Sequence, residues 1–137
     1  MRERIKDYDR LLHIREAIAN VYEFMEGKNV NDLVNDKLLF YGVVKNVEII
    51  GEAAYMLTKE FIELHPLTPW IDIIGMRHVL VHGYYTASPL LMWDTYKNDL
   101  DVLRLQISGS GDRYLTRGEH FLNKKRFFPQ FPLPFRE

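Results

Sequence analysis

The sequence predicts an all-α protein, an antiparallel four-helix bundle followed by an extended C-terminal tail. Three observations support this fold class. Apolar residues recur every three or four positions over long stretches, which is the period of an amphipathic helix. Glycine and proline signals divide these stretches into four, and none of the stretches shows the alternation of a convincing β-strand. Because the links are short, helices that follow one another are expected to run antiparallel.

The first helix is expected over roughly residues 2–26, with Gly27 as its stop. Its apolar stripe consists of Leu11, Ile14, Ile18, Val21 and Met25. His13 lies beside this stripe and is interpreted as a partly buried or boundary histidine. The polar link at residues 28–32 is expected to be a loop, or a loop that runs into a helical turn capped by Asn31 or Asp32.

The second helix is expected to begin near residues 33–36 and to end at about Leu64. Its stripe is the longest in the chain and consists of Leu39, Val43, Val47, Ile50, Ala54, Leu57, Phe61 and Leu64. The small residues Gly51, Ala53 and Ala54 would let another helix approach closely at that point. Glu52 lies among them and is interpreted as a solvated or hydrogen-bonded helix carboxylate.

The third and fourth helices each follow a capping residue and a proline. Thr68 is the expected N-cap of the third helix, with Pro69 at the first helical position, and this helix is expected to end near residues 82–83. A serine–proline pair at residues 88–89 repeats the signal. The fourth helix is expected to continue to a serine- and glycine-rich boundary at residues 108–111.

The C-terminal end of the chain differs from the rest in charge and pattern. Residues 108–137 carry six basic and three acidic groups, whereas residues 1–107 carry twelve basic and sixteen acidic groups. This distribution does not fit non-specific binding to long duplexes, so no DNA partner is expected, although a small phosphate site is compatible with it. We therefore divide the chain into a bundle over residues 1–108 and a basic, aromatic and proline-rich extension over residues 109–137. The extension has no period and is expected to lie over its own bundle or a neighbour, in preference to acting as an arm that binds RNA or protein.

Composition excludes several functional classes. The chain has no cysteine, so disulfides, thiolate metal sites and thiol nucleophiles are ruled out. No apolar run approaches the roughly eighteen residues needed to cross a bilayer, and the charged start lacks the apolar core of a signal peptide. A cytoplasmic location without a membrane partner is therefore expected. Any catalysis would have to use histidine, carboxylate, arginine, lysine, tyrosine or hydroxyl groups.

Residues 75–85 concentrate groups that can transfer protons and bind phosphate, namely Arg77, His78, His82, Tyr84 and Tyr85. His78 and His82 have the spacing of a two-histidine metal pair, but the stretch contains no aspartate or glutamate to complete a site, and no metal is expected. A guanidinium can instead hold a phosphate and stabilise a phosphorane, while an imidazole moves a proton. Together these two groups could cleave RNA by attack of its own 2′-hydroxyl.

The spacing of Arg77 and His82 favours a dimeric site. Five residues separate the two side chains by about 140° on an ideal helix. They would converge within one chain only if the helix is already ending at His82, which Gly83 would allow. One arginine and one histidine make a thin active site, so a symmetric dimer that brings two copies together is the more credible arrangement.

The pattern Arg77, four residues, His82, one residue, Tyr84 resembles the signature of HepT-like toxins, a branch of the HEPN superfamily of small α-helical domains. Further segments resemble landmarks of this family in its order, namely Asp7–Ala17, Ile50–Ala54, Pro69–Arg77 and His82–Tyr85. The resemblance covers about residues 4–107.

This resemblance implies a homodimer whose paired arginines and histidines line a cleft, and an activity as a metal-independent endoribonuclease that acts as a toxin on transfer or messenger RNA. It implies that Arg77 takes the phosphate and transition-state role, that His82 takes the acid–base role and that His78 is an auxiliary. The alternative is a non-catalytic HEPN binding module that partners a nucleotidyltransferase.

The resemblance also implies a way to switch the protein off. A partner nucleotidyltransferase of the MNT type, acting as the antitoxin, would use ATP to adenylylate Tyr84, while the protein itself would need no cofactor. An AMP group two residues from His82 would occupy the pocket for the RNA phosphate and repel it electrostatically. The neighbouring Tyr85 is interpreted as a packing aromatic.

Overall fold

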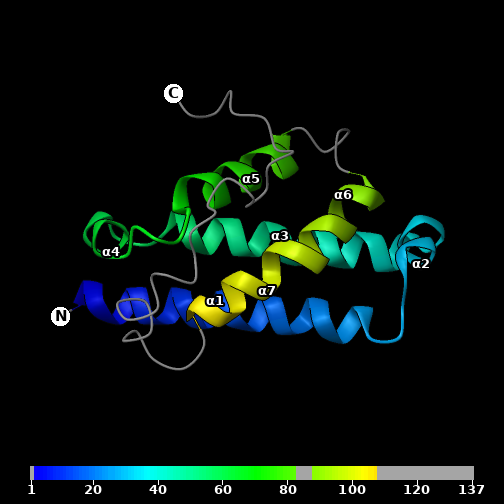
Figure 1. The fold of residues 1–137 in the computed structure, drawn as a ribbon. Helices are drawn as coiled ribbons and strands as arrows, with labels where there is room; N and C mark the ends of the chain where they lie inside the picture. The colour runs from blue at the N-terminus through cyan, green and yellow to red at the C-terminus, as the bar shows by residue number, and fades with distance from the viewer. Residues whose placement is uncertain (1, 83–87, 108–137) are drawn as a thin grey trace.

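The computed structural model describes residues 2–82 and 88–107, and its side chains from residue 6 onward. These ranges contain helices and no strand, which confirms the all-α prediction (Figure 1). The helices are α1 (Arg2–Met25), α2 (Val30–Asn35), α3 (Lys37–Tyr55), α4 (Lys59–Leu64), α5 (Trp70–His82), α6 (Pro89–Asp94) and α7 (Leu100–Ile107), with a π-helical turn, η2 (Thr95–Asp99), between α6 and α7. Across these ranges, no helix has both the length and the apolar character that a membrane crossing requires. The C-terminal extension lies outside the described residues.

Four long helical segments form the bundle, and α3 lies at its centre. It packs against α1 on one side and α5 on the other, while the continuous segment α6–η2–α7 crosses in front of α3 and α1 (Figure 1). Successive long segments run antiparallel, as predicted. The short helices α2 and α4 lie at opposite ends of the bundle, and α2 also contacts α6. The core residues with no exposed surface are Ile14, Val21, Val43, Val47, Ile50, Ala54, Ile73, Met76, Met92, Leu100 and Leu103.

Helix α1 ends as predicted, but the cap of α2 differs from the prediction. Gly27 has a φ of 74°, the left-handed conformation that glycine adopts at little cost. The side chain of Asn29 accepts a hydrogen bond from the Asp32 backbone N–H at 3.1 Å, and the Asp32 carboxylate accepts one from the Asn29 N–H at 2.8 Å. Asn29 is therefore the N-cap in place of Asn31 or Asp32. His13 is exposed, so its placement at the core boundary was also wrong.

The sequence predicted one long second helix, but the structure has two, α3 and α4, because the helix is interrupted after Tyr55. The Thr58 hydroxyl caps α4 by accepting a hydrogen bond from the Phe61 N–H at 3.1 Å. Asp7 of α1 fixes this break, since its carboxylate accepts from the Thr58 N–H at 2.9 Å and from the Thr58 hydroxyl at 2.7 Å. Leu57 remains buried, so the apolar period continues through the break and hides it in the sequence.

A side-chain hydrogen bond connects the segment just before the start of α5 to the last turn of α7. The Pro69 carbonyl accepts the first helical hydrogen bond, from the Ile73 N–H at 3.1 Å, so Pro69 occupies the cap position that was predicted for Thr68. The Thr68 hydroxyl instead donates to Gln106 Oε1 at 2.9 Å, and both side chains are buried. The predicted serine cap at residue 88 is confirmed, because its side chain accepts a hydrogen bond from the backbone of Leu91 at 3.1 Å.

Candidate active site

Helix α5 crosses α3 at Gly51, which positions the candidate catalytic arginine. A Cβ atom added at Gly51 would lie 3.0 Å from the Cα and the backbone N of Arg77, and closer still to the Arg77 Cβ. No larger residue fits there without moving one helix, because real Cβ contacts are rarely that short. The prediction that the small residues of this helix admit a close neighbour is therefore confirmed, and the neighbour is the α5 backbone at Arg77.

Two residues of α3 hold the Arg77 side chain. Arg77 Nε donates a hydrogen bond to Glu52 Oε1, and the guanidinium carbon lies 5.2 Å from the centre of the Tyr55 ring. The Arg77 side chain is 27% exposed and that of Glu52 is 50% exposed, so this pair lies at the surface of the single chain. A charge-assisted hydrogen bond and a cation–π contact both fix the orientation of a guanidinium. The arginine is thus pre-oriented while still accessible.

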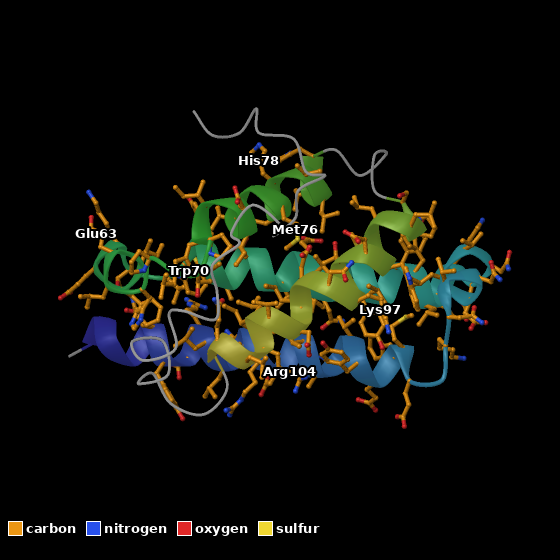
Figure 2. The ribbon with its side chains drawn as sticks, in the orientation of Figure 1. Glu63, Trp70, Met76, His78, Lys97 and Arg104 are labelled. Carbon is orange, nitrogen blue, oxygen red and sulfur yellow. The ribbon has the colours of Figure 1, made fainter. Side chains whose placement is uncertain are left out.

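The two candidate histidines lie together on α5. The ring centres of His78 and His82 are 4.5 Å apart and their planes are tilted by 49°. His82 is exposed and His78 is partly exposed, and Figure 2 shows His78 on the outer side of α5. In the part of the chain that the structure describes, no cluster of three or more histidine, aspartate or glutamate side chains could hold a metal ion.

Helix α5 contains both Arg77 and His82, and His82 is its last described residue. An unbroken helix directs residues five apart about 140° away from each other. The structure therefore groups Arg77 with Glu52 and Tyr55 on the α3 side, and His78 with His82 on the outer side. Gly83, Tyr84 and Tyr85 lie outside the described residues.

The interpretation of Glu52 as a hydrogen-bonded helix carboxylate is confirmed, but the contacts of Glu52 and Tyr55 with Arg77 were not predicted from the sequence. Both residues follow Gly51 within one helical turn, so they lie near the point where α5 crosses α3. The sequence does contain a signal for these contacts. Gly51 predicts a close helix crossing, and such a crossing brings the neighbouring side chains of one helix within reach of the other helix. What the sequence lacked was the identity of the residue on α5 that meets Gly51.

The structure is thus a helical bundle in which one helix presents an oriented arginine and two adjacent histidines. The chain belongs to the HepT-like family, since the family model described as "Ribonuclease HepT-like" matches residues 14–108. The family's name indicates ribonuclease activity.

Curated relatives agree with this assignment. A Thermococcus cleftensis protein named "Probable ribonuclease HepT" is 36% identical over 104 residues, which cover 76% of this chain and 93% of that protein. A Methanocaldococcus jannaschii protein, provisionally named as an RNase, is 32% identical over 97 residues, or 71% of this chain and 89% of its own length. A provisionally named RNase of Caldanaerobacter subterraneus is 36% identical over 97 residues, or 71% and 87% of the two chains. No solved structure gives a significant match.

Proposed function

We propose that this protein is a metal-independent endoribonuclease toxin of a HEPN–nucleotidyltransferase toxin–antitoxin system. The observation that carries the proposal is the clamp on Arg77. Its side chain is held by Glu52 and Tyr55 at the surface, one residue before His78 and one helical turn and a half before His82. Because this guanidinium is already oriented, it loses less conformational entropy when it binds a phosphodiester. The ribonuclease names of the family and the relatives support the same chemistry.

In the proposed reaction, the 2′-oxygen of a ribose attacks the adjacent phosphorus, and the bond from phosphorus to the 5′-oxygen of the next nucleotide breaks. The products are a 2′,3′-cyclic phosphate and a free 5′-hydroxyl. The His82 imidazole of the site removes the proton of the 2′-hydroxyl and, once protonated, delivers a proton to the leaving oxygen. Arg77 stabilises the extra negative charge of the phosphorane, and His78 assists as an auxiliary.

A homodimer would supply the second set of groups. Arg77 and His82 diverge by about 140° on one helix, so a phosphate held by one arginine is better placed for the histidine of a second copy. Val81 of α5 is 37% exposed and would be covered in such a pairing.

Regulation is proposed at Tyr84, two residues after His82. A partner nucleotidyltransferase would transfer AMP from ATP to the Tyr84 hydroxyl, with release of pyrophosphate, and the attached phosphate would repel RNA from the site. The intact mass after incubation with this partner and ATP tests the assignment. A gain in AMP-sized steps that disappears in Tyr84→Phe is expected, whereas modification at another residue contradicts it.

Growth inhibition tests the toxin function. Induced expression of the wild-type protein is expected to arrest a bacterial host, and Arg77→Ala and His82→Ala are each expected to abolish the arrest at equal protein levels. Arrest by both variants would contradict the site assignment.

The ion pair of Arg77 with Glu52 favours a second candidate function, a HEPN binding module without turnover. The Glu52 carboxylate offsets the positive charge of Arg77 that would otherwise attract a phosphate. That candidate predicts nucleotidyltransferase binding without RNA cleavage.

A further inference from the structure

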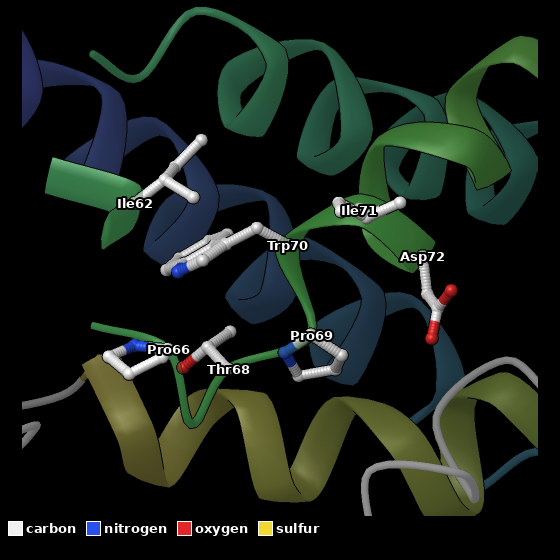
Figure 3. A pocket seen from close by; sticks show the side chains of 7 residues that line it. All are labelled: Ile62, Pro66, Thr68, Pro69, Trp70, Ile71 and Asp72. Carbon is white, nitrogen blue, oxygen red and sulfur yellow. The ribbon is translucent and has the colours of Figure 1, made fainter. Parts of the chain in front are cut away.

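A pocket of about 360 Å³ lies between α4 and the first turn of α5, at the end of α5 opposite the candidate catalytic residues (Figure 3). Its apolar lining consists of Ile62, Pro66, Pro69, Trp70 and Ile71. Volumes of this size are typical of ligand sites. Trp70 is held in place because its indole N–H donates to the His65 carbonyl at 3.0 Å. Ile71 is 66% exposed, so an apolar binding partner would find a large uncovered side chain there.

The pocket is connected to the last turn of α7. Thr68 lines the pocket, and its hydroxyl donates to Gln106, one residue before the last residue of α7. The Gln106 side chain is 1% exposed, and its Nε2 atom has no hydrogen-bond acceptor among the residues that the structure describes. A buried donor left unpaired is destabilising.

The chain that follows α7 has the composition to fill the pocket. Thirty residues follow Ile107, and the aromatic–proline segment of residues 127–135 contains Phe127, Phe128, Pro129, Phe131, Pro132, Leu133, Pro134 and Phe135. Proline-rich segments adopt an extended helix at low entropic cost and bind grooves lined by aromatic rings. In this pocket Pro66 and Ile71 are exposed, whereas Trp70 is 2% exposed and forms the base.

The charges next to the aromatic–proline segment are opposite in sign to those around the pocket. The aromatic–proline segment directly follows three consecutive basic residues at positions 124–126. Asp72 lines the pocket, and Glu60 and Glu63 are exposed on the adjacent helix α4, where Figure 2 labels Glu63. The basic residues would therefore meet acidic groups when the segment lies in the pocket. Such exposed charges add orientation more than affinity, since solvent screens each pair.

The length of the connection favours binding within one chain. About twenty residues separate Ile107 from the segment, and a flexible connection of that length has a root-mean-square span of roughly 25 Å. It begins with glycines and serines at residues 108–111. The tether gives a local concentration on the order of millimolar, so even a weak site would be occupied by its own tail before a second copy could bind.

We propose that the aromatic–proline segment 127–135 binds the pocket between α4 and α5 of the same chain and thereby anchors the first turn of the helix that carries Arg77. The family match ends at residue 108, so this contact is an addition to the family fold. The contact does not depend on ribonuclease activity, and its test is independent of RNA cleavage.

Because the full chain has no cysteine, paired cysteines report the contact directly. Ile71→Cys is combined in turn with Phe128→Cys, Phe131→Cys and Phe135→Cys, and each protein is oxidised mildly. At least one pair is expected to form a disulfide within a single chain, seen as a loss of two hydrogens from the monomer mass. The control is Leu38→Cys with the same tail positions, since Leu38 is 85% exposed at the start of α3, away from the pocket.

Disulfides that join two chains, or equal cross-linking at positions 38 and 71, would overturn the proposal. A double-mutant cycle without cysteines gives an independent answer. Phe128→Ser with Phe131→Ser is expected to lower the melting temperature by a few degrees in the wild-type background and to have little effect in an Ile71→Lys background. Equal shifts in both backgrounds would show that the tail does not bind at Ile71 and would also overturn the proposal.

Discussion

Gly51 of α3 lies directly against the backbone of Arg77 of α5. A Cβ atom at Gly51 would approach the Arg77 Cα and N to 3.0 Å, so α5 can lie this close to α3 only because Gly51 has no side chain. The position of Arg77 therefore depends on Gly51. The same crossing brings Glu52 and Tyr55 to the guanidinium. The placement of the candidate catalytic arginine is therefore a consequence of helix packing and does not depend on a loop.

Replacement of Gly51 by alanine tests this relationship. Gly51→Ala is expected to push α5 away from α3, to lower the free energy of unfolding by about 1–3 kcal/mol and to reduce RNA cleavage further than this loss of stability explains. Chemical denaturation and single-turnover cleavage at a temperature where the variant is folded measure the two effects. Gly75→Ala is the control for stability, because a Cβ there meets nothing within 4 Å. Wild-type stability of Gly51→Ala would contradict the close crossing.

Glu52 is expected to position Arg77. Glu52→Gln weakens the acceptor of the Arg77 Nε hydrogen bond, so cleavage is expected to fall by about 10- to 100-fold through loss of orientation. Stability is expected to change by less than about 1 kcal/mol, because this ion pair is partly exposed. The matched control is Glu48→Gln, one turn earlier on α3, whose carboxylate lies 3.9 Å from Lys45. If Glu52→Gln cleaves as fast as the control, Glu52 has no positioning role.

A mixture of two inactive variants tests whether the site is shared between copies. Arg77→Ala and His82→Ala each leave the other residue intact, so a mixed dimer contains one complete site if arginine and histidine come from different chains. With random exchange, about a quarter of wild-type activity is expected from an equal mixture. Cleavage assays before and after subunit exchange measure the gain. No recovery in mixed dimers, when their formation is verified by mass, would contradict a site built from one arginine and the partner's histidine.

His65 is expected to make stability depend on pH. Burial lowers the pKa of the His65 imidazole below its ordinary value of 6.5, and the ring packs on Phe61 with 4.2 Å between centres. Between the lowered folded pKa and 6.5, the unfolded chain binds more protons, so stability falls as pH drops through this range. Melting temperatures from pH 7.5 to 5 are expected to show a slope that His65→Gln reduces. His13→Gln, at an exposed position, is the control, and an unchanged slope in His65→Gln would refute the assignment.

The sequence predicted the main helices because their apolar stripes and caps are local signals. Gly27 and the serine cap of α6 are single-residue features that need no tertiary information. The break between α3 and α4 was missed because Leu57 stays in phase with the stripe. Its cause is the Asp7 carboxylate, which binds Thr58 from a position 51 residues away in the sequence. Thr58 followed by Glu60 was the local sign of a new helix.

The candidate site was only partly predictable for the same reason. The motif residues Arg77, His78 and His82 are close together in the sequence, and their relation on one helix follows from their spacing. The contact of Arg77 with Glu52 spans 25 residues and depends on which turn of α5 meets Gly51. Small residues predict that a close approach occurs, but the register of two packed helices is set by the whole interface.

Cleavage of RNA by the purified full chain in excess chelator tests the central claim most directly. The wild-type protein is expected to cut single-stranded or transfer RNA and to leave 2′,3′-cyclic phosphate and 5′-hydroxyl ends. Arg77→Ala and His82→Ala are each expected to be at least about 100-fold slower while the oligomer keeps its wild-type size. Absence of cleavage by the wild-type protein, or wild-type rates in both variants, would contradict the account.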